Sequence, residues 1–173
     1  MRVPFWNSHF MGEHMISGNF YFLTDEYCEK YKTYGIMENK ETEDDEPHNR
    51  PCFYAVPDED NENIFWMIPI SSNISKYRDI LNKKLRRYKD YDGLEFGYVM
   101  GREAAFLLQN ICPVTLEYIV EEYIDFNSGD PVSIPSDLKR KLNQKARKII
   151  RLAKKGTKIS LTDVVSILND LRE

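Results

Sequence analysis

Three short runs of aromatic and β-branched residues constrain the fold of this chain most. They are Asn19–Leu23 (NFYFL), Cys52–Val56 (CFYAV) and Ile64–Ile70 (IFWMIPI), and Gly, Pro, Asn and Asp residues bound them. Such runs are typical of buried β-strands, because these side chains fit a pleated surface. With 11 Tyr, 9 Phe and 2 Trp among 173 residues, the chain carries enough apolar surface for a core of its own.

The rest of the chain alternates between extended and helical patterns. Strands are predicted at 94–100, 105–111 and 131–134, and helices at 74–90, 115–124, 136–156 and 160–173. Thr24, Ser75 and Ser136 are the expected N-caps, and residues 39–49 are an acidic connection. This mixed order predicts an α+β fold, for which we expect a compact, strongly bent antiparallel β-barrel with helices packed outside it.

Residues 1–14 differ from the remainder in periodicity and contain two of the three histidines, so they are interpreted as a leader or a vector-derived segment. Residues 15–173 are expected to form a single domain. The three cysteines are too widely spaced for a disulfide framework, and no apolar run approaches the ~20 residues of a membrane helix. These features predict a cytoplasmic protein with no membrane partner.

The net charge of −4 conceals two strongly basic segments. Residues 76–89 hold seven basic residues and one acid, and residues 138–158 hold ten basic residues and no acid. Like charges at helical spacing repel, so such a helix indicates a polyanionic partner, with a merely solvated face as the alternative. The predicted contact residues are Arg78, Lys83, Lys84, Arg86, Arg87, Lys139, Arg140, Lys141, Lys145, Arg147, Lys148, Arg151, Lys154 and Lys155.

The sequence lacks the motifs of many enzyme classes. It contains no GxGxxG, P-loop, HExxH, GxSxG or EF-hand pattern, and His48 is the only histidine outside the leader. The ten acids between Glu38 and Glu62 are interpreted as solvated loops rather than a magnesium site. We therefore expect neither a metal nor a cofactor.

The junction after the third strand is the strongest candidate for chemistry. Ser71 and Ser72 follow a buried strand, and Lys76 lies at the start of a basic helix. Hydroxyls, backbone N–H groups and an ammonium can together hold a phosphoryl group at such a junction. Equally, the serines can simply cap and turn, and Arg50 can either bind a phosphate or pair with a surface acid.

The order of several segments resembles the ToxN/AbiQ/CptN toxins of type III toxin–antitoxin systems. The segments are Phe20–Leu23 followed by Tyr27, then Asn39–Glu41 (NKE), Asn49–Ala55 (NRPCFYA) and Ile68–Lys76 (IPISSNISK). The NKE, RPCFYA and IPISSNISK stretches are most similar to the CptN branch. The resemblance extends from about Met15 to the C-terminal basic helix.

This resemblance implies a bacterial, metal-independent endoribonuclease on a barrel related to the MazF/PemK toxins. A folded pseudoknot RNA, which the toxin cuts from a repeated precursor, inhibits such enzymes. The resemblance also implies cellular or phage RNA as substrate, a role in phage defence by abortive infection, and RNA-bridged oligomers. The basic segments would then bind RNA.

The resemblance implies a catalytic role for Tyr27, Arg50, Ser71, Ser72 and Lys76. Arg50 stands where ToxN has lysine, so Lys40 is an alternative source of that charge. Arg78 stands where ToxN has a stacking tryptophan.

The implied reaction is attack of the RNA 2′-OH on its own phosphate, which gives a 2′,3′-cyclic phosphate and a 5′-OH. The serines and Lys76 would hold the phosphate, Tyr27 or Lys40 would protonate the leaving oxygen, and the base is unassigned. The alternative functions are a non-catalytic RNA-binding module and an enzyme acting on a small phosphate ester.

Overall fold

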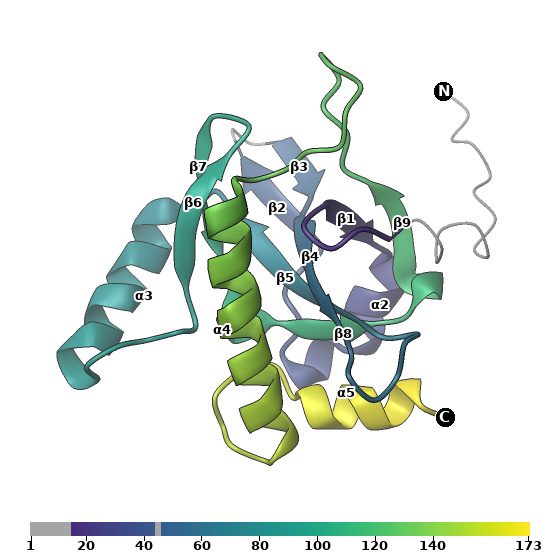
Figure 1. Ribbon diagram of the computed structural model, residues 1–173, viewed down its shortest axis with the longest axis vertical. Coiled ribbons are helices and arrows are strands. Elements are labelled where there is room, and N and C mark those ends of the chain that lie inside the picture. Colours follow the sequence, from purple (N-terminus) through teal and green to yellow (C-terminus); the bar gives the residue numbers. More distant parts are fainter. Residues whose placement is uncertain (1–14, 44–45) are drawn as a thin grey trace.

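A computed structural model describes residues 15–43 and 46–173, with residues 40–43 and 46–48 described by their backbone alone. Its main sheet has seven strands in the order β6-β7-β5-β4-β1-β9, with β8 paired to β5, and every ladder is antiparallel (Figure 1). The strands of this sheet are β1 (Phe20–Leu23), β4 (Pro51–Pro57), β5 (Phe65–Ser71), β6 (Glu95–Val99), β7 (Arg102–Phe106), β8 (Cys112–Val114) and β9 (Ile119–Glu122). A separate hairpin joins β2 (Lys40–Glu43) to β3 (Glu46–Asn49).

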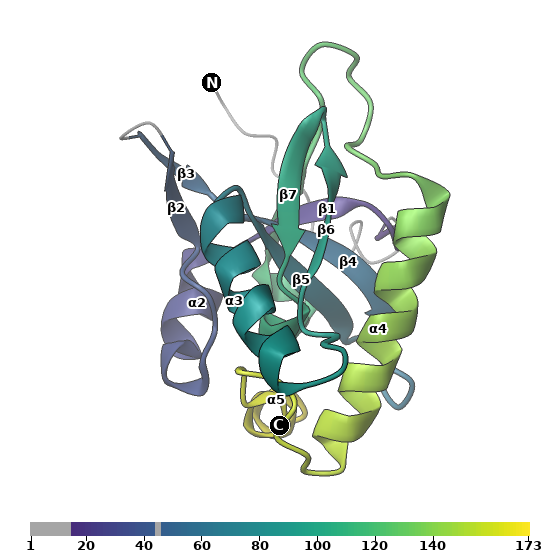
Figure 2. The same cartoon turned by 90° about the vertical axis from the view of Figure 1, so that its left-hand side faces the viewer.

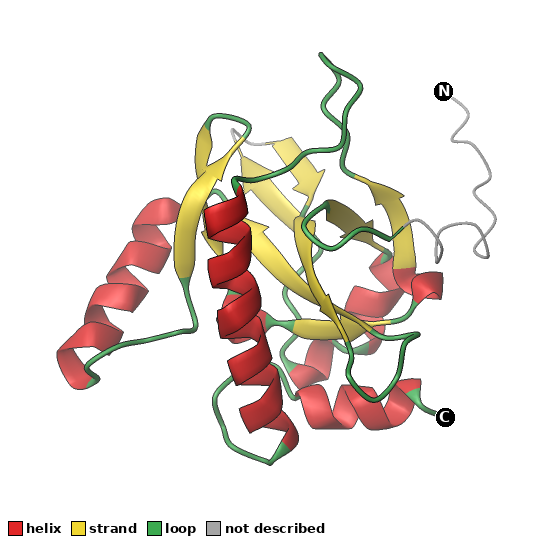
Figure 3. Cartoon of the chain, in the orientation of Figure 1, coloured by secondary structure: helices red, strands yellow, loops and turns green. Residues whose placement is uncertain are grey.

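Within the described residues, four α-helices lie around the sheet (Figure 3). They are α2 (Asp25–Lys30), α3 (Ile74–Arg87), α4 (Ser136–Lys154) and α5 (Val164–Leu171), and short 3-10 turns cover Lys32–Tyr34, Leu108–Asn110 and Leu116–Tyr118. Thr24 caps α2 as predicted, because its hydroxyl accepts the Tyr27 N–H. Asn73 caps α3 in place of Ser75, and Ser136 is the first residue of α4 rather than its cap.

Two apolar layers cover the two faces of the central strands. Phe53 of β4 and Trp66 of β5 belong to the layer under α4, whereas Tyr54 and Met67 belong to the opposite layer with α2. A bulge between Tyr54 and Val56 lets Ala55 and Val56 both face α4. The helix side of this layer is formed by Leu142, Ala146, Ile149, Ile150 and Ala153, all of them buried. Burial on both faces explains why these strands are continuously apolar.

The sheet is bent but does not close, so the predicted barrel is not confirmed, whereas the α+β class with helices outside is. The edge strands β6 and β9 share no ladder within the described residues. The reason lies in β7, which pairs with β5 only at Ile70 and Ser71. Beyond these pairs the β6–β7 hairpin packs against α3 and α4 (Figure 2). Gly97 permits this contact, because a Cβ there would lie 2.3 Å from Leu138 of α4.

Several local predictions are wrong where tertiary pairing overrides the sequence pattern. Residues 115–124, predicted as a helix, form a 3-10 turn and strand β9, because the edge of β1 offers a ladder. The strand predicted at 105–111 ends at Phe106, and that at 131–134 is a single bridge from Ile124 to Pro131. The acidic connection contains the β2–β3 hairpin.

Candidate active site

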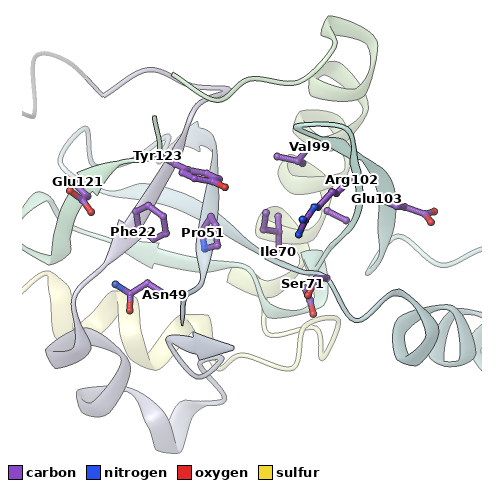
Figure 4. A pocket seen from close by; sticks show the side chains of 12 residues that line it. Phe22, Asn49, Pro51, Ile70, Ser71, Val99, Arg102, Glu103, Glu121 and Tyr123 are labelled. Atoms are coloured by element: carbon purple, nitrogen blue, oxygen red, sulfur yellow. The ribbon is translucent and has the colours of Figure 1, made fainter. Parts of the chain in front are cut away.

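A cavity of about 400 Å³ lies where the strands of the bent sheet end (Figure 4). Its lining residues come from β1, β3, β4, β5, β6, β7, β9 and the adjoining loops. They are Phe22, Asn49, Pro51, Ile70, Ser71, Ser72, Val99, Arg102, Glu103, Ala104, Glu121 and Tyr123. The cavity therefore contains the predicted serines, together with polar residues for which no role was predicted.

The antiparallel register explains why distant segments meet here. Phe22 of β1 pairs with Pro51 at the start of β4 and with Glu121 of β9. Ser71, at the end of β5, pairs with Ala105 of β7. Because β4 and β5 are antiparallel, the start of one lies beside the end of the other. Strand ends from across the sheet thus converge on one cavity.

Ser71 and Ser72 play different structural roles. Ser71 is only 3% exposed, and its hydroxyl accepts the Asn73 N–H at 3.1 Å, so it shapes the turn into α3. Ser72 is exposed and lines the same cavity. Helix α3 starts at Ile74, and its N-terminal end adds a partial positive charge next to these hydroxyls. Ser72 is therefore the more accessible of the two hydroxyls.

Arg50 is buried and contacts the backbone rather than the cavity. Its Nε donates to the Glu38 carbonyl at 3.0 Å, and its Nη1 donates to the Ile70 carbonyl at 2.9 Å. Only 7% of the residue is exposed, and it does not line the cavity that contains the serines. Arg50 therefore fixes the end of β5 immediately before Ser71.

Arg102 supplies a cation that the sequence interpretation missed. It is exposed at the start of β7, lines the cavity, and its guanidinium points toward Ile70 (Figure 4). The neighbouring Glu103 points away and forms an ion pair with Arg78, whose guanidinium lies 4.5 Å from the Phe96 ring centre. Nothing local to the sequence distinguishes Arg102, because only the β7–β5 pairing places it beside the serines.

Aromatic residues form the wall opposite Arg102. Tyr123 and Phe22 contact each other edge to face, with ring centroids 5.3 Å apart. In Figure 4 these rings and Pro51 face Arg102 and Val99 across the cavity. One wall is therefore aromatic and the other is cationic.

Tyr27 and Lys76, two further predicted catalytic residues, are not among the residues that line this cavity. Tyr27 is fully buried, and its hydroxyl donates to the Pro113 carbonyl at 2.6 Å. Burial, with the neighbouring Cys112, raises the pKa of Tyr27 well above its usual value. Lys76 is exposed on α3, with Nζ 5.3 Å from the Tyr77 ring centre. The side chain of Lys40 lies outside the described residues, and its backbone pairs with Asn49.

Acidic residues from other parts of the fold pair with lysines of α4. Glu95 pairs with Lys145 at 2.8 Å and with Lys141 at 3.5 Å. Asp92 pairs with Lys148, and Asp58 and Asp60 pair with Lys154. The expectation that this helix needs an external polyanion to relieve repulsion is therefore wrong for these four lysines, because tertiary contacts neutralise them.

Most of the remaining predicted contact residues of α3 and α4 are exposed, and two are half-buried. Lys139 is half-buried against Gly18, and Lys84 is half-buried with Nζ 5.4 Å from the Tyr91 ring centre. Among the predicted contact residues, the exposed cations without an ion pair to a described acid are Lys83, Arg86 and Arg87 of α3, and Arg140, Arg147, Arg151 and Lys155 of α4 or its end. The α4 group recurs at intervals of seven and four residues, which places it along one side of the helix.

Two further properties concern metals and membranes. Within the described residues, no group of three or more His, Cys, Asp or Glu side chains is arranged to hold a metal ion. None of the helices in the described part of the chain combines the length and apolarity needed to span a bilayer.

Comparison with known proteins gives a structural match and no sequence match. Neither a protein-family model nor a curated protein sequence matches the chain. The fold is similar to that of AbiQ, a lactococcal anti-phage endoribonuclease belonging to the type III toxin–antitoxin system, with a TM-score of 0.62. The match covers 88% of this chain and 94% of AbiQ at 15% sequence identity. The likeness therefore establishes a shared fold across nearly the whole of both chains.

Proposed function

We propose that this protein is an endoribonuclease toxin of a type III toxin–antitoxin system. The observation that carries the proposal is the cavity, in which Ser72 and Arg102 line the same space on a fold similar to that of AbiQ. A hydroxyl donor and a guanidinium suit the non-bridging oxygens of a phosphodiester. We propose the CptN branch of this family, on the sequence resemblance alone.

The proposed reaction uses the nucleophile that RNA itself carries. The 2′-OH attacks the adjacent phosphorus, the bond to the 5′-oxygen breaks, and a 2′,3′-cyclic phosphate and a 5′-OH result. Ser72 and Arg102 stabilise the charge that develops on the phosphate, and Ser71 with Arg50 holds the loop that presents Ser72. No metal takes part in this proposed scheme.

Proton transfer to the leaving oxygen needs a group that reaches the cavity. The burial of Tyr27 removes it from this role. Tyr123 is the phenol that lines the cavity, so we assign the donor role to Tyr123, with Lys40 as the alternative from the sequence. The phenol O–H is a group that can transfer a proton to the leaving oxygen in the transition state.

The proposed partners are RNA molecules of two kinds. A cellular or phage RNA is the substrate, and a folded pseudoknot RNA derived from a repeat is the antitoxin. The exposed cations of α3 and α4 suit an RNA backbone, and Lys76 lies at the cavity end of α3. We further propose that RNA bridges several protein copies and that the protein acts in the bacterial cytoplasm.

The decisive experiment incubates RNA-free protein with mixed RNA in EDTA and analyses the new ends. We expect discrete cuts that end in cyclic phosphate, and their loss in Ser72→Ala. The matched control is Ser75→Ala, an exposed serine three residues further along that does not line the cavity. Intact RNA that nevertheless binds tightly would instead establish a non-catalytic RNA-binding module.

A further inference from the structure

A short hairpin stands beside the cavity at the end of β9. Figures 1 and 2 both show it projecting beyond the β6–β7 hairpin at the same end of the molecule. The Val132 N–H donates to the Tyr123 carbonyl at 2.9 Å, and a bridge joins Ile124 to Pro131. Since Tyr123 lines the cavity, the hairpin continues directly from the aromatic wall.

The tip of this hairpin is organised by its own hydrogen bonds. The Asp125 N–H donates to the Asp130 carbonyl at 2.9 Å, and the Gly129 N–H donates to the Asp125 carbonyl at 2.7 Å. Gly129 has φ +74°, which suits glycine in the turn. The Asp125 carboxylate also accepts the Asn127 N–H. The tip is therefore a hydrogen-bonded turn rather than an irregular loop.

Phe126 occupies this tip and is 97% exposed, more than any other large apolar side chain among the described residues. Tip positions of turns usually carry small polar residues, so the turn itself does not require phenylalanine. Three residues span at most about 11 Å, so Phe126 lies within that distance of Tyr123 along the backbone. Proteins commonly stack unpaired bases on an exposed aromatic side chain, and here the hydrogen-bonded turn holds such a side chain beside the proposed RNA site.

The charges around the cavity indicate which part of an RNA strand meets each wall. Arg102 lies on the β7 wall and attracts phosphate. Glu121, Asp125 and Asp130 lie on or beyond the β9 wall, where carboxylates repel phosphate but accept hydrogen bonds from base amino groups. The backbone of a bound strand therefore faces Arg102, and its bases face Tyr123 and Phe126.

We propose that the 125–130 hairpin is a nucleobase-binding wall, on which Phe126 stacks an unpaired base of the single-stranded RNA whose phosphate lies in the cavity. This inference rests on the proposed function and names contacts for its substrate. The hairpin and the cavity would together recognise two features that all ribonucleotides share, a flat base and an anionic backbone.

The test measures binding of a fluorescent pool of short 2′-O-methyl oligoribonucleotides, which lack the free 2′-OH needed for cleavage. Phe126→Ala is expected to weaken binding about 5- to 100-fold, whereas Phe126→Trp keeps the affinity and its indole emission is quenched by the stacked base. The control is Tyr98→Ala, which removes another exposed aromatic. Tyr98 faces away from the cavity, because side chains alternate along β6 and its neighbour Val99 lines the cavity.

Unchanged affinity in Phe126→Ala, or an equal loss in Tyr98→Ala, would overturn the proposal. A loss of self-association in Phe126→Ala with RNA binding intact would also overturn it, because the residue would then contact a second copy of the chain. If the wild type binds the pool through Phe126 yet cleaves no RNA, the nucleobase wall stands and the proposed ribonuclease function fails.

Discussion

The guanidinium of Arg50 donates a hydrogen bond of 2.9 Å to the carbonyl of Ile70, the residue immediately before Ser71. A second bond, from Nε to the Glu38 carbonyl, ties the same side chain to the segment before β2. Because Arg50 is buried behind the cavity, it acts on the site by holding the end of β5 in place. Arg50 is therefore a positioning residue.

Arg50→Ala is expected to destabilise the protein by about 1–3 kcal/mol, because the buried Ile70 carbonyl and the Glu38 carbonyl both lose their donor. It should also lower kcat at temperatures where the variant remains fully folded, with KM changed less. Arg50→Lys restores one donor and should recover part of kcat. Chemical denaturation and steady-state cleavage separate the two effects, and a normal kcat in folded Arg50→Ala would contradict the positioning role.

Arg102→Ala should reduce cleavage by roughly 100- to 1,000-fold, because the variant loses a cation aimed at the reacting phosphate. The side chain is exposed, so the free energy of unfolding should change little. Arg172→Ala, which removes an exposed arginine near the C-terminus, is the control. Comparable rates for Arg102→Ala and the control would remove Arg102 from the proposed site.

Tyr27→Phe is expected to cleave RNA at the wild-type rate, because the buried hydroxyl donates to the Pro113 carbonyl and contacts Cys112 in the core, away from the cavity. The lost hydrogen bond should cost about 1 kcal/mol of stability. Single-turnover cleavage together with thermal unfolding measures both quantities. A folded Tyr27→Phe protein without activity would return Tyr27 to the catalytic group that the family resemblance implies.

Asp58 links the β4–β5 turn to α4, since its Oδ1 accepts the Trp66 Nε1–H at 2.9 Å and lies 2.6 Å from the Lys154 Nζ. Burial alone would raise the pKa of Asp58, but the hydrogen bonds from Lys154, Trp66 and the Asp60 N–H hold it below its usual value. A lowered pKa in the folded state stabilises the protein above the unfolded-state pKa, and this contribution disappears as pH falls through the folded value.

Asp58→Asn should therefore cost about 1–3 kcal/mol at pH 7, with Lys154 left without its buried partner. The difference from wild type should shrink as the pH falls from about 4, where the unfolded chain begins to bind the proton, down through the lowered folded-state pKa of Asp58. Urea unfolding across this pH range is the measurement. A difference that stays constant with pH would show that the charge of Asp58 has no part in stability.

The α4 cations should divide into two groups in RNA binding. Replacing Arg147 and Arg151 with Gln should reduce the dependence of log K on log salt by about 1.4 to 1.8, if each contacts one phosphate. Replacing Lys145 and Lys148, which are paired with Glu95 and Asp92, should reduce it less and should lower stability instead. Equal salt slopes for the two double variants would contradict this division.

The sequence by itself determined the elements whose signals are local. Consecutive apolar residues marked β4 and β5, because both faces of these strands are buried. Thr24 before an acidic turn marked the start of α2, and the apolar period of α4 placed its buried face correctly. The turn of Ser71 and Ser72 into α3 was identified for the same reason, since it depends on neighbours in the chain.

Only the tertiary structure decided the features that depend on pairing between distant segments. Residues 119–122 have a helical apolar spacing, but the free edge of β1 draws them into a strand. Arg102 lines the same cavity as the serines because the end of β7 pairs with Ile70 and Ser71 of β5. Tyr27 and Arg50 are buried, and their side chains donate hydrogen bonds to the carbonyls of Pro113 and Ile70. These outcomes depend on which strands lie side by side, and a periodic sequence pattern carries no information on that choice.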